Sequence, residues 1–267
     1  MSTNQAIPFV KASACGNDFL IIEGEQAPPD IAAFTRLICD RHNGVGADGV
    51  EWLYPAQDAD LRARLINADG SSAEISGNGT RCVAAHLVWQ SPREQVNIAT
   101  DAGVKVCTLI SHRETTYEFE TDMGEPRVSP EIKVTTQFGQ RTGIPVSMGN
   151  PHLVIFVNGC DFAWDEEAAV IAAQPIFPEG VNIEWVKEHT IHRIEARFFE
   201  RGAGVTQSSG TGTSAAAAAA IARKKVESPV EVHAPGGTQT VRWEGKSLYL
   251  RGPAQIIAHG EFLLRRY

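Results

Sequence analysis

Residues 76–80 read SGNGT and residues 209–213 read SGTGT, so one motif occurs twice, at a separation of 209 − 76 = 133 positions. Two further pairs have the same separation: GNDFLI at 16–21 with GNPHLV at 149–154, and EWL at 51–53 with EWV at 184–186. Each match is short, but three matches at one ungapped offset indicate a duplication. We interpret the chain as two halves of about 130 residues each.

The residues around these motifs predict what each half contains. Apolar content or alternation indicates strands at 18–23, 62–68 and 193–199, and Gly and Pro turns punctuate further strands at 95–121 and 229–266. A helix is expected to open at Asp30, with Ile31, Phe34, Leu37 and Ile38 on one face, and to have its counterpart at 165–173.

These elements predict an α/β (α+β) fold of two pseudo-symmetric halves. Each half is expected to be a strongly curved, barrel-like sheet around a central helix. The N-terminal half is placed at 1–121 with 253–267 returning to it, and the C-terminal half at 122–252.

Bulk composition excludes several function classes. The formal net charge is −8 and the longest basic run is 223–225, so a nucleic-acid partner is not expected. The longest apolar stretch, 215–222, is far shorter than the roughly 20 residues of a membrane span, and the N-terminus lacks a secretory pattern. Five scattered cysteines without a CxxC pair favour a reducing cytoplasm over disulfides or a zinc site.

The repeated motif itself indicates how a ligand would be held. Glycines allow close approach of the backbone, and the Ala-rich segments that follow, 80–89 and 215–223, are expected to be helices. A helix start presents unpaired N–H groups and a dipole that favours an anion. We expect two such ends, with Ser76 and Ser209 facing each other across a cleft, to hold one small carboxylate.

Two other interpretations of these glycines stay open. The motifs are also compatible with simple turns and helix caps. A dinucleotide loop is a second alternative, because 201–204 is Gly-rich as well. The full GxGxxG and GxxxxGK[ST] patterns are nevertheless absent.

Polar residues beside the glycine motifs are candidates for binding an amino-acid ligand. Glu200 and Arg201 follow an apolar run and so lie at an expected strand end, where Arg can fork onto a carboxylate. His152 follows a proline and fits a structural role as well as a catalytic one. The asparagines that lie in or beside turns are Asn17, Asn67, Asn78, Asn150 and Asn182.

With these segments identified, the chain from residue 9 to about 257 resembles the diaminopimelate epimerase family, relatives of proline racemase. The resemblance rests on GNDF at 16–19, RHNGVGADG at 41–49, NADG at 67–70, GNPH at 149–152 and ERGAGVT at 200–206. It implies a fold of two similar α/β halves and a cofactor-free isomerase of lysine biosynthesis. A homodimer and a small, diaminopimelate-like amino-acid substrate are also implied.

The resemblance further implies the chemistry and its residues. In the family a thiolate removes the Cα proton on one face and a thiol returns a proton on the other, which converts LL- to meso-diaminopimelate. The two cysteine positions are occupied here by Ser76 and Ser209, and Ser13 stands where the family commonly has His. His152 and Glu200 are expected to assist proton transfer. The reacting carboxylate is assigned to Gly77, Asn78, Gly210 and Thr211, and the distal amino-acid group to Asn17, Asn67, Asn150, Asn182, Glu200 and Arg201.

The two serines leave the activity open. A hydroxyl is a far weaker acid than a thiol, and the effect of a helix N-terminus, up to about 2 kcal/mol, does not close that difference. Three explanations remain: deliberate replacement of both cysteines, natural divergence to slow epimerisation or to elimination of water from a hydroxy amino acid, and amino-acid binding without turnover. Cys82 is not expected to substitute, because it lies beyond the helix start.

Overall fold

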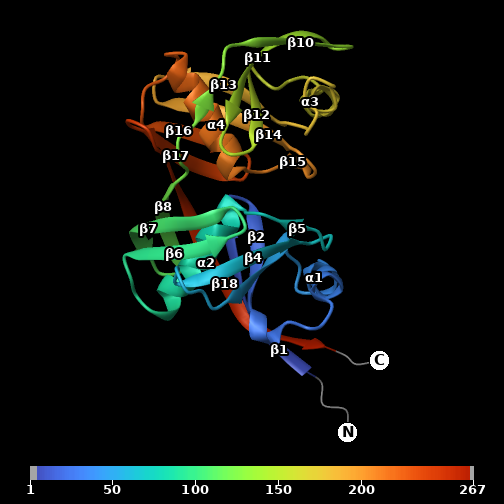
Figure 1. Cartoon of the computed structure of the whole chain (residues 1–267), viewed down its shortest axis with the longest axis vertical. Coiled ribbons are helices and arrows are strands. Elements are labelled where there is room, and N and C mark those ends of the chain that lie inside the picture. Colours follow the sequence, from blue (N-terminus) through green and yellow to red (C-terminus); the bar gives the residue numbers. More distant parts are fainter. Residues whose placement is uncertain (1–4, 265–267) are drawn as a thin grey trace. The chain divides into compact units, whose positions relative to one another are not determined.

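The computed structural model describes residues 5–264. The chain divides into two compact units: one comprises the residues up to Thr121 and those from Gly252 on, and the other comprises Asp122–Arg251. Figure 1 shows both units as mixed α/β structures, each with one helix among its strands and one helix outside them.

The first unit is a closed barrel of eight strands. The hydrogen-bonded ring runs β1–β2–β3–β4–β6–β7–β8–β18 and returns from β18 to β1. The strands are β1 (Gln5–Ala14), β2 (Asn17–Glu23), β3 (Gly49–Tyr54), β4 (Leu61–Asn67), β5 (Ser72–Ala73), β6 (Gln95–Thr100), β7 (Gly103–Arg113), β8 (Thr116–Asp122) and β18 (Leu248–Leu264). The helices are α1 (Ile31–Cys39) and α2 (Gly77–Gln90), with a short 3₁₀ turn at Gly24–Gln26.

The second unit repeats this ladder as β9–β11–β12–β13–β14–β16–β17–β18. Backbone hydrogen bonds of Met123 and Gly124 with Leu248 join the start of the unit to β18. The strands are β9 (Arg127–Val128), β10 (Ile132–Thr136), β11 (Gly139–Ser147), β12 (Pro151–Phe156), β13 (Asn182–Thr190), β14 (Arg193–Glu200), β15 (Gly204–Thr206), β16 (Val230–Ala234) and β17 (Gly237–Trp243). The helices are α3 (Trp164–Ala172) and α4 (Gly210–Ala222).

The elements repeat at the offset found in the sequence. Adding 133 to the bounds of α1 gives those of α3, and α2 and α4 begin 133 residues apart, as do β3 and β13. In each unit the strand pairs joined through a helix are parallel: β2–β3 and β4–β6 in the first, β12–β13 and β14–β16 in the second. The predicted fold class, two pseudo-symmetric halves around central helices, is confirmed.

Each unit has an inner and an outer core. The inner core surrounds the central helix, so α2 and α4 are buried on all sides and lack an apolar stripe; in α4 the six alanines 215–220 have no exposed surface. The outer core lies between the sheet and α1 or α3. One detail of the α1 prediction is wrong: Phe34 and Ile38 are buried, but Leu37 is 44% exposed.

Candidate active site

Ser76 and Ser209 cap the two central helices. Ser76 Oγ accepts a hydrogen bond from the Gly79 N–H (3.1 Å), and Ser209 Oγ accepts one from the Gly212 N–H (3.2 Å). The carbonyl of each serine accepts the next helical N–H in turn. Both serines have extended backbone, as N-cap residues usually do.

This capping moves the helix starts. The helices were predicted from residues 80 and 215, but they begin at Gly77 and Gly210. The difference has a physical reason: each serine hydroxyl satisfies one of the N–H groups that a helix start leaves unpaired, so the glycines are held within the first turn. The N–H groups of Gly77, Gly210 and Thr211 therefore point out of the helix ends, where an anion is favoured.

The end of α4 carries a serine–carboxylate pair. Ser209 is 4% exposed, and its hydroxyl donates to Glu200 Oε2 at 3.0 Å. The other Glu200 oxygen accepts from Thr206 Oγ1 at 2.7 Å, which fixes the carboxylate between β14 and β15. Glu200 is thus within proton-transfer distance of Ser209.

His152 is linked to the same helix end by a chain of hydrogen bonds. Its Nδ1 lies 2.7 Å from Glu184 Oε1 and its Nε2 lies 2.9 Å from Asn150 Oδ1, while Asn150 Nδ2 donates to Thr211 Oγ1 at 3.4 Å. Because the Asn150 amide donates to Thr211 and turns its oxygen to the ring, Nε2 acts as the donor in this arrangement. Burial raises the pKa of the Glu184 carboxyl, with His152 opposing that effect.

Asn182 and Arg201 are held mainly by the protein itself. The Asn182 side chain donates to the Pro151 carbonyl at 2.9 Å and accepts from the Arg201 backbone N–H at 2.8 Å. The exposed Arg201 guanidinium donates to the Glu179 carbonyl at 2.8 Å. Asn182 therefore shapes the turn that carries Arg201, whose remaining N–H groups face solvent.

The end of α2 carries a network of amides. Asn17 Oδ1 accepts from Asn78 Nδ2 at 2.7 Å, and Asn17 Nδ2 donates to Asp48 Oδ2 at 3.0 Å. Arg81, one turn along the helix, donates to Asn78 Oδ1. Asn67, which stands 133 residues before Glu200, donates to Ser71 Oγ at 3.0 Å. In the first unit, the predicted residues Asn17 and Asn78 are thus brought together at the end of the helix that Ser76 caps.

Sequence reasoning missed one pair of residues here. Glu51 and Glu184 were used only as evidence of the repeat, yet both are buried carboxyls that lie against the second glycine of the motif, Gly79 and Gly212 respectively. The signal was available, because a Glu inside an otherwise apolar strand is rare unless it is paired or functional. The second glycine of each motif therefore makes room for a carboxyl.

The cysteine of α2 offers no replacement for a catalytic thiol. Cys82 is fully buried in the inner core, and burial raises the pKa of its thiol. Within residues 5–264, no cluster of three or more His, Cys, Asp or Glu side chains has the arrangement of a metal site. None of the described helices is long and apolar enough to cross a membrane.

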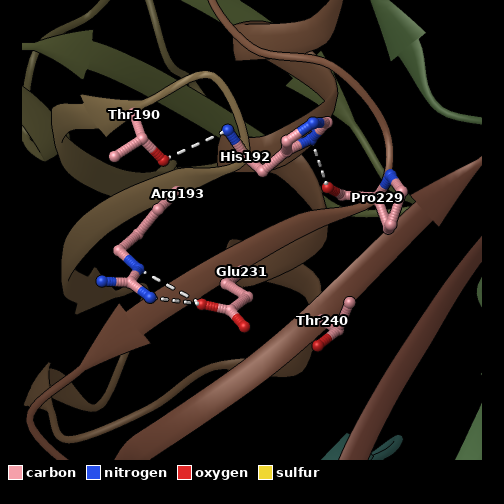
Figure 2. Close-up of a pocket in the computed structure, with 6 residues that line it drawn as sticks. All are labelled: Thr190, His192, Arg193, Pro229, Glu231 and Thr240. Carbon is pink, nitrogen blue, oxygen red and sulfur yellow. Dashed lines mark hydrogen bonds and ion pairs between the residues drawn. The ribbon is translucent and has the colours of Figure 1, made fainter.

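A hollow on the second unit, shown in Figure 2, lies apart from these residues. Its charged and imidazole groups pair with one another or with the backbone: Arg193 contacts Glu231 at 3.1 Å, and His192 Nδ1 lies 2.9 Å from the Glu227 carbonyl. Its lining residues are Thr190, His192, Arg193, Pro229, Glu231 and Thr240, and none of them was predicted as a site residue.

Sequence comparison identifies close relatives over the whole chain. The diaminopimelate epimerase of Pelotomaculum thermopropionicum is 37% identical, with 96% of this chain and 99% of the relative covered. The diaminopimelate epimerase of Carboxydothermus hydrogenoformans is 34% identical, with the same coverage of both chains.

Solved structures share the fold at low sequence identity. A hydroxyproline epimerase from Agrobacterium vitis superposes with a TM-score of 0.74 at 17% identity, covering 99% of this chain and 94% of its own. A PhzF-family phenazine biosynthesis protein from Bacillus anthracis superposes with a TM-score of 0.73 at 15% identity, covering 97% and 100%. These likenesses support the two-half architecture.

The family model described as diaminopimelate epimerase matches residues 9–129 and 144–257. This match confirms the resemblance found in the motifs, and with it the enzyme class, an epimerase-type isomerase. The chain therefore belongs to the diaminopimelate epimerase family.

Proposed function

We propose that this chain inverts one α-carbon of a diaminopimelate-like amino acid, LL to meso, by cofactor-free proton transfer between two faces. The observation that carries the proposal is the hydrogen bond from Ser209 Oγ to Glu200 Oε2, at the capped end of a central helix. Ser76 caps the equivalent helix of the other unit. Ser76 and Ser209 are assigned the acid and base positions.

On the Ser209 face, the proton moves in two coupled steps. As Ser209 Oγ takes the proton from Cα, its own hydroxyl proton passes to the Glu200 carboxylate 3.0 Å away. The electron pair of the broken C–H bond remains on the substrate, delocalised toward its carboxylate. On the opposite face Ser76 Oγ–H donates a proton to Cα, which completes inversion.

The helix ends stabilise the charge that this reaction develops. Backbone N–H groups of Gly77, Gly210 and Thr211 are assigned to the reacting carboxylate, together with Asn78, because fixed donors are most effective where negative charge grows. Asn17, Asn67, Asn150, Asn182, Glu200 and Arg201 are assigned to the distal group. The hydrogen bonds of His152 to Glu184 and Asn150 support a positioning role for this buried ring.

The test is deuterium uptake at the α-carbons of LL- and meso-diaminopimelate in D₂O, followed by proton NMR. We expect slow uptake with the parent chain, because serine is a poor base, and an increase of several orders of magnitude with Ser76→Cys and Ser209→Cys together. Each single substitution should recover much less. Ser111→Cys, a thiol added on the exposed face of β7, is the control and should match the parent.

Two results would overturn the proposal. One is a folded double-Cys variant that binds substrate but shows no uptake above the parent, which would leave an amino-acid binder. The other is a structure with bound substrate in which the two serine oxygens are more than about 10 Å apart, since both must reach one carbon.

A further inference from the structure

Glu51 places a carboxyl inside the first barrel. It lies on β3, where Val50 and Trp52 pack in the outer core while Leu53 packs in the inner core around α2. Because side chains alternate along a strand, Glu51 shares the inner face with Leu53. The residue is 3% exposed.

The carboxyl lies against the first turn of α2. Its Cδ and the Cβ of Ser76 are each 3.2 Å from the position that a Cβ on Gly79 would occupy, so the two atoms are no more than twice that distance apart. Among the described residues, none forms a hydrogen bond with this carboxyl, and burial is the one cause of its altered titration. Burying a carboxyl in this way favours its protonated, neutral form.

The equivalent residue of the second unit, Glu184, has a different partner. Glu184 lies against Gly212 in the same way, but one of its oxygens contacts His152 Nδ1 at 2.7 Å. At the position in the first unit that corresponds to His152, the chain has Phe19. The Ser209 end therefore has Glu200 as a direct acceptor. At the Ser76 end, no hydrogen bond from Ser76 to a carboxylate occurs within residues 5–264, and the nearby buried carboxyl is that of Glu51.

We propose that Glu51 supplies the proton that Ser76 delivers to the substrate, so that the first unit acts as the acid and the second as the base. This inference rests on the proposed function. Ser76 Oγ–H gives its proton to Cα and recovers one from the Glu51 carboxyl, directly or through one water, which leaves Glu51 as a carboxylate. Glu200 gains the proton that Cα lost, and solvent restores both groups after product release. Glu51 acts through Ser76 and is therefore a positioning residue.

The surroundings of Glu51 keep its carboxyl protonated, which is the form that can donate. Burial raises its pKa to about 8, so the carboxyl holds its proton at neutral pH. The titratable groups that share this region are Arg81 and Cys82 on α2, Cys15 in the β1–β2 connection and Asp18 on β2. A protonated carboxyl is a far stronger acid than a hydroxyl, so it can restore the proton of Ser76.

The test is Glu51→Gln, which keeps the shape and neutrality of the protonated side chain. With LL- and meso-diaminopimelate in D₂O, we expect inversion to fall at least 10-fold. Deuterium uptake by one configuration should stay within about 3-fold of the parent, because the Ser209 face still works, while uptake by the other is lost. Glu51→Asp should restore part of the inversion. Inversion by the parent should decline above pH 8 as Glu51 ionises, and this decline should be absent from the residual inversion of Glu51→Gln.

The matched control is Glu23→Gln, the same change on β2 at the exposed strand end, which should equal the parent. Equal rates for Glu51→Gln and Glu23→Gln, or equal loss of uptake for both configurations, would overturn the role of Glu51 and leave the proposed function standing. Deuterium uptake seen only in the double-Cys variant would also overturn the role of Glu51, because the serines would then transfer no proton to or from the substrate. Absence of uptake in every variant would overturn the proposed function itself.

Discussion

The N-terminal ends of α2 and α4 are built on one plan but carry different chemistry. Both have a serine cap, a Gly-X-Gly first turn and a buried glutamate against the second glycine. Around Ser209 the second unit adds Glu200 and His152, whereas the first unit has Asn67 and Phe19 at the equivalent positions. Duplication therefore preserved the helix ends, while the residues hydrogen-bonded around them diverged. The proposed two-face proton transfer assigns a different role to each of these ends.

The largest expected effect comes from removing the acceptor that only the Ser209 end has. Glu200→Gln keeps the size of the side chain but cannot take up the serine proton, so inversion should fall by roughly 10²–10⁴-fold. Asn67→Gln changes the equivalent position of the first unit, a residue assigned to the distal group. Its effect should therefore appear mainly in KM, and the rate at saturating substrate should fall much less. Rates are read from deuterium uptake. Equal losses in the two variants would mean that the ends do not differ in the way we describe.

The buried carboxyl of Glu51 should also make the free energy of unfolding depend on pH. The folded pKa of Glu51 is about 8 against an ordinary value of 4.5, so the unfolded chain loses this proton first as pH rises. The free energy of unfolding should therefore fall between about pH 4.5 and 8. Glu51→Gln removes this slope and should be more stable than the parent at pH 8, by about 4 kcal/mol at most, and similar at pH 4.5. Urea unfolding at both pH values tests this; a parallel pH dependence of parent and variant would contradict it.

Substituting the two glycines that lie against Glu51 and Glu184 should destabilise the fold, and removing the facing glutamate should restore stability to a different extent at each. A Cβ on Gly79 would overlap with a carboxyl oxygen of Glu51, whereas a Cβ on Gly212 would lie 2.8 Å from Glu184 Oε1 and 2.9 Å from Phe198 Cδ1. Each Gly→Ala change should destabilise the fold by about 1–3 kcal/mol. Adding Glu51→Ala should relieve most of the Gly79→Ala loss, but Glu184→Ala should relieve only part of the Gly212→Ala loss. Double-mutant cycles in urea measure both couplings, and additive losses at Gly79 would contradict the contact.

The repeat made much of this fold predictable from sequence, because elements that follow a fixed offset confirm one another. The helix starts were misplaced by three and five residues, since Gly is a poor helix former and the serine caps that retain it act through hydrogen bonds. Glu51 was missed because it was used only as part of the repeat, although a Glu inside an apolar strand is itself a signal. Its contact with the first turn of α2 depends on tertiary packing and was outside the reach of local patterns. The pairing of Ser209 with Glu200 depends on the β14–β15 turn and was likewise outside the reach of local patterns.

The smallest expected effect concerns the outer helices, whose starts also differ between the units. Asp30 caps α1 by accepting from the Ala33 N–H at 2.9 Å, but α3, 133 residues later, begins after Ala163, which has no side chain to do this. Asp30→Ala should therefore lower the free energy of unfolding by about 1 kcal/mol. Ala163→Asp should raise it by less, because the first turn of α3 already holds three acidic residues that would repel another. Thermal unfolding at moderate salt tests both, and a gain at Ala163 as large as the loss at Asp30 would show that those acidic residues are screened and that the missing cap alone distinguishes the two helices.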